Sequence, residues 1–133
     1  MIGFDTGFFV ELIRGSDEAV QVWKTLVDKE DDGIVSCLTL FELEKLGLKG
    51  AIRRVEILLD SIPEVCRIIW LDPENLSLAA KLSHGLGIPT VDSLILSGFL
   101  REEGRIIYTT DSHLEKYKGK GVKVRNIRPL KSK

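Results

Sequence analysis

The sequence has few of the features that mark secreted, membrane or zinc-binding proteins. Cysteine occurs twice, at Cys37 and Cys66, and neither belongs to a Cys-x-x-Cys pair or lies near a histidine cluster. We therefore expect two buried thiols rather than zinc ligands. No apolar run approaches the roughly 20 residues that span a bilayer. Asp5 interrupts the apolar start, and the N-terminus lacks the basic flank and cleavage site of a signal peptide. We expect a cytoplasmic protein with no membrane partner.

Two common functional motifs are absent from the sequence, and the amide residues asparagine and glutamine are scarce. The chain contains no Gly-x-Ser-x-Gly elbow and no glycine-rich phosphate loop of the Walker or dinucleotide type. These absences argue against a serine hydrolase and against the common nucleotide-binding folds. Asparagine and glutamine occur only at Gln21, Asn75 and Asn126. Thermophile proteins are often poor in these labile amides, although one short chain gives only a weak indication.

The composition is that of a globular domain with an uneven charge distribution. The 133 residues are 44% apolar and 29% charged, which predicts one domain over residues 1–133 with a substantial core. From residue 116 onward there are eight basic residues and no acid, so the rest of the chain carries a formal charge of −9. The basic residues are Lys116, Lys118, Lys120, Lys123, Arg125, Arg128, Lys131 and Lys133. This segment is either a solvated tail or a surface for a phosphate backbone.

Short apolar runs alternate with segments of helical periodicity along the whole chain. The patterns predict strands at residues 1–5, 34–37, 65–71, 105–109 and 122–127. They predict helices at residues 6–14, 16–29, 39–48, 51–60, 72–84, 90–103 and 112–117, with Pro63 as a break after the fourth helix. Alternation of this kind implies parallel pairing with helices on both faces of the sheet. The predicted fold class is α/β with three layers.

Four acidic residues lie where strands end or helices begin. Asp5 ends the first predicted strand, Asp111 follows the fourth, and Glu42 and Asp92 lie in the first turns of predicted helices. Ligands of open parallel sheets bind beyond the carboxyl ends of the strands, so these four side chains could converge there. Each also has a simpler interpretation as a helix-capping acid, and Thr39-x-x-Glu42 matches a capping box.

A divalent cation would make such a convergence chemically sensible. Carboxylates crowded together without a cation repel one another and raise each other's pKa. Mg²⁺ and Mn²⁺ prefer oxygen ligands and would remove that repulsion. A cation held in this way can activate water and stabilise the charge that develops on a phosphodiester.

Four segments, in order along the chain, resemble the motifs of the PIN-domain family, particularly its small ribonuclease toxins of the VapC type. The segments are Ile2-Gly3-Phe4-Asp5-Thr6, Ser36-Cys37-Leu38-Thr39-Leu40-Phe41-Glu42-Leu43, Gly87-Ile88-Pro89-Thr90-Val91-Asp92-Ser93-Leu94-Ile95 and Ile107-Tyr108-Thr109-Thr110-Asp111. The resemblance implies a five-stranded parallel sheet between helices, in the order 3-2-1-4-5. It also implies an endoribonuclease with one or two Mg²⁺ or Mn²⁺ ions, which is commonly a homodimer restrained by a cognate antitoxin.

The same resemblance assigns roles to individual residues. Carried over, the catalytic and metal-binding residues would be Asp5, Glu42, Asp92 and Asp111. Thr6 and Thr110 would be supporting hydroxyls, with Thr110 orienting a ligand or water. The RNA-contacting candidates are Lys116, Lys118 and Lys120, and Glu115 is a candidate for an additional acid that the family often has. The chain departs from the family at Gly7, where Asn is common, and this predicts weaker activity more than a changed fold.

Other interpretations of the sequence remain open. A catalytically silent module of the same fold could bind RNA or a protein, because a fold does not establish an activity. A phosphoaspartyl phosphatase or a receiver-like domain is less favoured, since Gly7 stands where such a phosphatase needs a second Asp. Outside the four acids, we expect His113 to be an exposed helix residue. We expect Trp23 and Trp70 to lie in the core.

Overall fold

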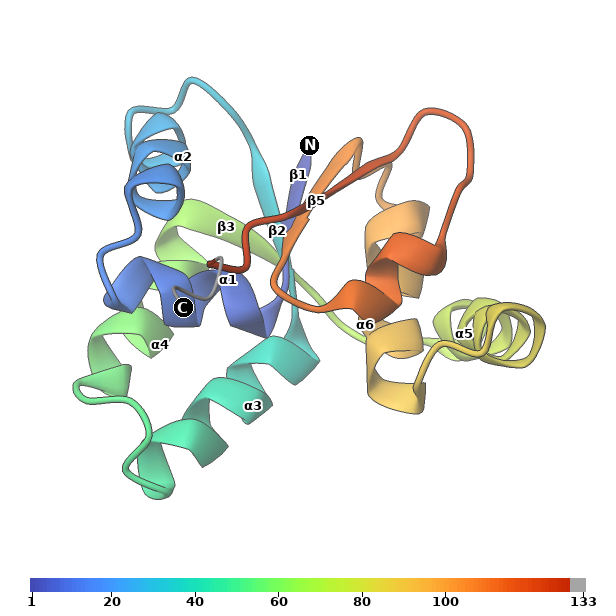
Figure 1. Cartoon of the computed structure of the whole chain (residues 1–133), viewed down its shortest axis with the longest axis horizontal. Coiled ribbons are helices and arrows are strands. Elements are labelled where there is room, and N and C mark those ends of the chain that lie inside the picture. The colour runs from blue at the N-terminus through green and yellow to red at the C-terminus, as the bar shows by residue number, and fades with distance from the viewer. Residues whose placement is uncertain (130–133) are drawn as a thin grey trace.

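Strands and helices alternate through the computed structural model, which describes residues 1–129 (Figure 1). The strands are β1 (Ile2–Phe4), β2 (Gly33–Ser36), β3 (Cys66–Ile69), β4 (Ile106–Thr109) and β5 (Lys123–Asn126). The helices are α1 (Thr6–Ile13), α2 (Asp17–Val27), α3 (Cys37–Leu48), α4 (Val55–Val65), α5 (Pro73–Leu86), α6 (Thr90–Arg101) and the short 3₁₀ helix η1 (Ser112–Lys116). Lys131 and Lys133, which end the expected basic segment, lie outside the described residues.

All five strands are parallel and have the order β3-β2-β1-β4-β5, which confirms the predicted sheet. The strand order reverses at β1, which pairs with β2 on one side and with β4 on the other. Phe4 at the end of β1 is in register with Tyr108 of β4. The residues that follow these two strands therefore emerge side by side at the carboxyl edge of the sheet.

Helices cover both faces of the sheet and give the predicted three layers. Neighbouring strand residues point to opposite faces, so Val35 packs into one core and Ile34 into the other. The first core joins β1 and β2 to α1, α2, α3 and α4, and its centre is an aromatic group around Phe4, Phe8 and Phe9. The second core joins the sheet to α5, α6 and η1. Figure 1 shows α2 and α4 on one side of the sheet and α5 and α6 on the other.

Three expectations about the middle of the chain were wrong. The helix expected over residues 51–60 is α4, which begins at Val55 after Arg54 adopts a left-handed conformation with φ of 56°. It continues through Pro63 to Val65 and does not break there, although the proline cannot donate the helical hydrogen bond to the carbonyl of Leu59. The strand expected over residues 65–71 is the four-residue edge strand β3, in which Arg67 is exposed.

Exposure of individual side chains also differs from expectation. Trp70 was expected in the core but is 69% exposed, because it follows an edge strand that has no neighbour beyond it. Trp23 packs against the aromatic group, as expected. Cys66 is buried, which raises the pKa of its thiol to about 12, whereas Cys37 is only half-buried. Within the described residues, we find no helix with the length and apolarity needed to traverse a membrane.

Candidate metal centre

A cavity of about 140 Å³ lies at the carboxyl edge of the sheet, at the point where the strand order reverses. It is lined by the four acids singled out in the sequence and by both of the predicted supporting threonines. The complete lining is Asp5, Thr6, Gly7, Glu42, Asp92, Ile95, Thr110 and Asp111. The fold thus brings together side chains from β1–α1, α3, α6 and the turn after β4.

Asp5 both caps α1 and lines the cavity. One carboxylate oxygen, Oδ1, accepts a hydrogen bond from the backbone N–H of Phe8 at 3.2 Å, which is the capping contact. The other, Oδ2, accepts a hydrogen bond from the hydroxyl of Thr109. Asp5 is only 7% exposed. Burial raises its pKa to about 7, the two hydrogen bonds oppose that rise, and the charges of Asp111 and Asp92 add to it.

Glu42 reaches the cavity from the second turn of α3. The helix begins at Cys37, and Ser36 is its N-cap, with its hydroxyl accepting from the N–H of Leu38 at 3.2 Å. The alternative interpretation of Thr39-x-x-Glu42 as a capping box is therefore wrong, since Thr39 lies inside the helix. The carboxylate of Glu42 instead accepts a hydrogen bond from the hydroxyl of Thr6 at 2.5 Å. Thr6 thereby fixes Glu42 toward Asp5.

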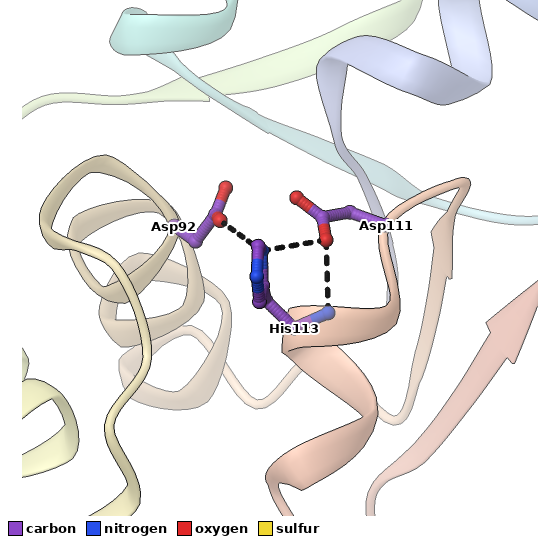
Figure 2. Close-up of side chains that lie close together, drawn as sticks. All are labelled: Asp92, Asp111 and His113. Atoms are coloured by element: carbon purple, nitrogen blue, oxygen red, sulfur yellow. Dashed lines mark hydrogen bonds and ion pairs between the residues drawn. The ribbon is translucent and has the colours of Figure 1, made fainter.

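Asp92 and Asp111 face each other across the cavity mouth (Figure 2). Asp92 is in the first turn of α6, and burial together with the charge of Asp111 raises its pKa to about 6. Asp111 caps η1, with Oδ1 accepting from the N–H of His113 at 2.8 Å. Partial burial would raise the pKa of Asp111, but its contacts with His113 outweigh burial and lower it. As pH rises, Asp111 therefore loses its proton before Asp92 does.

Two further residues, Thr109 and His113, contact the acids, and the sequence did not predict these contacts. Thr109 is fully buried, and its hydroxyl donates to Asp5 while accepting from the N–H of Asp111 at 2.8 Å. His113 was expected on an exposed helix surface but is only half-exposed and lies between Asp92 and Asp111. Neither contact could be read from local pattern, because Thr109 is typical of any strand end and His113 of any short helix.

Thr109→Val tests this connection, because valine keeps the shape and removes only the hydroxyl. We expect the metal-free protein to lose about 1–3 kcal/mol of unfolding free energy near pH 7, since the buried N–H of Asp111 and an oxygen of Asp5 lose their partner. The pKa of Asp5, measured by carboxyl NMR titration, should rise above about 7. Thr25→Val is the control, because its hydroxyl bonds only to the Val22 carbonyl of its own helix. Equal losses for both variants in urea unfolding would contradict this role.

Position 7 is a glycine where the family often has asparagine, and in this structure a side chain there would collide with Thr110. A Cβ atom at position 7 would lie 1.8 Å from Oγ1 of Thr110 and 2.9 Å from its Cβ. The hydroxyl of Thr110 thus occupies the space that a side chain at position 7 would need. Whether this arrangement weakens activity, as the sequence suggested, stays a prediction.

The three lysines proposed to contact RNA are separated in the structure. Lys116 is the last residue of η1, and its Nζ lies 3.4 Å from the carbonyl oxygen of Gly87, in the turn that precedes α6. Lys118 lines a neighbouring cavity with Glu115. Lys120 lines a cavity with Arg105, at the amino end of β4 and so at the opposite edge of the sheet. None of the three lysines lines the acidic cavity.

The donor atoms at this site suit a hard divalent cation. They are chiefly carboxylate oxygens, and the raised pKa values of Asp5 and Asp92 reflect a crowding of negative charge that a cation would relieve. The imidazole Nδ1 of His113 makes no aligned hydrogen bond among residues 1–129, although Asp92 and Asp111 both lie within ion-pair distance of it. Asp92, Asp111 and His113 each offer one ligand atom, and these atoms lie within 4.8 Å of one another.

Fold and site together define a parallel α/β protein with a carboxylate-lined cavity at its topological switch point. The sequence model of the PIN domain matches residues 2–120, and the chain belongs to the PIN domain family. No curated protein sequence matches it.

Solved structures with this fold include three toxin–antitoxin assemblies. VapBC2 from Rickettsia felis, bound to a promoter DNA fragment, aligns with a TM-score of 0.74 and 20% identity over 95% of this chain and 98% of that chain. A toxin–antitoxin complex from Klebsiella pneumoniae gives a TM-score of 0.68 and 18% identity over 92% and 95% of the two chains. VapBC-1 from nontypeable Haemophilus influenzae gives a TM-score of 0.67 and 15% identity over 95% of this chain and 98% of that chain. At these identities the matches demonstrate a shared fold.

Proposed function

We propose that this PIN domain is an endoribonuclease that depends on Mg²⁺ or Mn²⁺. The observation that carries the proposal is the convergence of Asp5, Glu42, Asp92 and Asp111 on one small cavity. They come from four separate elements, and two of them have a raised pKa. Capping explains Asp5 and Asp111 only in part and does not explain Glu42 or Asp92, which make no capping contact.

In this proposal each side chain has a defined task. Asp5, Glu42, Asp92 and Asp111 hold the cation, which when bound supplies the Lewis acidity that activates water and offsets charge on the phosphodiester. Thr109 orients Asp5, and a separate hydrogen bond from Thr6 orients Glu42. The Thr110 hydroxyl lines the cavity, where it can donate to a water or ligand oxygen. Lys116 is the nearest of the candidate lysines for a backbone phosphate of the RNA.

We also propose that the chain is the toxin of a toxin–antitoxin pair, with a cognate antitoxin as partner and a homodimer as its assembly. The toxin–antitoxin assemblies that share its fold support this. So does an apolar surface on α3, where Phe41 is 62% exposed and Leu48 is 85% exposed. These two residues are seven positions apart and so lie on one face of the helix, which a protein partner would cover.

A matched pair of variants on α3 tests the nuclease proposal. Purified protein is incubated with a mixed pool of structured RNAs in Mg²⁺, Mn²⁺ or chelator. We expect cleavage only with metal, and a loss of about 100-fold or more in Glu42→Gln, because a ligand of the cation is neutralised. Glu44→Gln should cleave normally, since Glu44 is exposed on the same helix and does not line the cavity.

The same experiment separates the nuclease from a silent binding module of this fold. Metal-dependent cutting that Glu42→Gln retains would reject the assigned site. If no RNA is cut under any condition, calorimetric titration with Mn²⁺ decides between the two. A chain that binds RNA or protein without a metal centre should give no specific Mn²⁺ isotherm, whereas the proposed centre requires one that Glu42→Gln weakens.

A further inference from the structure

His113 points its ring into the gap between two of the candidate metal ligands. In Figure 2 the imidazole lies between the carboxylates of Asp92 on α6 and Asp111 at the start of η1. Nδ1 is 2.8 Å from Oδ1 of Asp111 and 3.4 Å from Oδ2 of Asp92. Both distances allow an ion pair if the imidazole is protonated, although neither contact has the alignment of a hydrogen bond among the described residues. If the imidazole is neutral, the Nδ1 lone pair faces two carboxylates, an arrangement that a cation between them would satisfy.

The spacing of these atoms resembles that of neighbouring ligands around one cation. In an octahedral site with bonds of about 2.1 Å, adjacent ligand atoms lie roughly 3 Å apart. The two measured separations, 2.8 and 3.4 Å, lie on either side of that value. A neutral imidazole with its proton on the other ring nitrogen would present a lone pair at Nδ1.

The position of His113 is fixed by contacts other than those of its ring. Its backbone N–H donates to Asp111 at 2.8 Å, so the residue and the acid are held together by the turn itself. The next residue, Leu114, is 1% exposed and anchors η1 in the second core. The backbone of His113 is therefore held beside Asp111 by the local fold.

We propose that His113 is a nitrogen ligand of the divalent cation, together with Asp92 and Asp111, and that it biases the site toward Mn²⁺ over Mg²⁺. The inference rests on the proposed metal-dependent function and adds a ligand and a metal preference to it. Mg²⁺ favours an all-oxygen shell, whereas first-row transition cations bind imidazole nitrogen more readily. A site with one nitrogen and several carboxylate oxygens therefore discriminates between the two cations in a way that four carboxylates alone would not.

Pulsed electron paramagnetic resonance of the Mn²⁺-loaded protein tests the ligand directly and requires no activity. We expect the wild-type protein to show ¹⁴N modulation from a directly coordinated nitrogen. The modulation should be absent from His113→Gln and present in His84→Gln, the matched control at the other histidine of the chain, which lies on α5 and lines a different cavity. In calorimetric titrations, the ratio of Mn²⁺ to Mg²⁺ affinity should fall about tenfold in His113→Gln and stay unchanged in His84→Gln.

The outcomes separate this inference from the function on which it rests. Mn²⁺ binding by the wild-type protein without ¹⁴N modulation would overturn the role of His113 and leave the carboxylate centre intact. Modulation that persists in His113→Gln would overturn it equally. Absence of specific Mn²⁺ binding in the wild-type protein would overturn both proposals. The wild-type spectrum answers the first question even if a variant fails to fold, and circular dichroism identifies such a variant.

Discussion

Asp5→Asn should abolish RNA cleavage and at the same time stabilise the metal-free protein above neutral pH. The loss of cleavage follows from removing one charge from the cation's ligands, which is expected to cost several kcal/mol of transition-state stabilisation, or about 1,000-fold in rate. Asparagine fits the local structure, because its oxygen can accept from the N–H of Phe8 and its amide can donate to the hydroxyl of Thr109. The fold should therefore survive.

The stability gain follows from the raised pKa of the buried carboxyl. In the folded protein Asp5 titrates near pH 7, against 3.8 as its ordinary value. Above pH 7 the carboxyl is charged in both states, and the folded state carries a penalty of about 4 kcal/mol at most. The penalty shrinks as pH falls from 7 toward 4, because the folded protein takes up the proton first, and it vanishes at lower pH. Asp5→Asn removes the penalty, so its advantage should be largest at pH 8.

Urea unfolding of the metal-free proteins at pH 8 and pH 4 checks this prediction. We expect Asp5→Asn to be more stable than wild type by on the order of 2–4 kcal/mol at pH 8 and nearly equal at pH 4. Added Mn²⁺ should stabilise the wild type much more than the variant, because only the wild type keeps the full set of acids. Asp28→Asn is the control, since Asp28 is exposed at the end of α2. A variant that is less stable than wild type at pH 8 would contradict the charge penalty assigned to Asp5.

Gly7→Ala should destabilise the protein by about 1–3 kcal/mol, although alanine is normally the better helix residue. The added Cβ would lie 1.8 Å from Oγ1 of Thr110, so either the threonine must leave its rotamer or α1 must shift. Both responses displace groups that line the acidic cavity. We therefore expect RNA cleavage to fall together with stability.

A double-mutant cycle with Thr110→Ala isolates this contact. Thr110→Ala removes the hydroxyl and the methyl group and leaves only the 2.9 Å approach of its Cβ, so Gly7→Ala should cost less in that background by about 1 kcal/mol or more. Gly85→Ala is the matched control, because it lies within α5 and a Cβ there meets nothing within 4 Å. That variant should gain about 0.5–1 kcal/mol. Additive effects of the first two substitutions would rule out the proposed clash.

The sequence was sufficient for those parts of the fold that depend on local pattern. The alternation of apolar runs and amphipathic segments predicted a parallel three-layer fold, and the ends of β1 and β4 were placed closely enough to locate Asp5 and Asp111. The strand order needed the family resemblance, because no local pattern states which strands are neighbours. Errors arose where local signals competed, as at residues 36–39, where Ser36 and Thr39 are both suitable N-caps and Ser36 has that role.

The remaining site contacts depend on residues distant in sequence, which local patterns do not report. Thr6 bonds to Glu42 across 36 positions, and Thr109 bonds to Asp5 across 104. The exposure of Trp70 likewise depends on the edge position of β3, which apolar character alone does not reveal. The four acids that line the cavity could be singled out from the sequence, whereas the contacts of Thr109 and His113 with them required the three-dimensional arrangement.

The pairing of β1 with β4 has a consequence for the synthesis of this protein. Ile2 pairs with Ile106, and the acid at position 5 meets its partner hydroxyl only after the chain has been made as far as Thr109. Contacts this distant in sequence close late and slow the folding of a small domain. A nascent chain that ends before Asp111 holds at most three of the four acids, and one that ends before β4 also lacks the strand pair that gathers them. Any activity that needs all four acids is therefore absent from a nascent chain until Asp111 has been added and β4 has paired with β1.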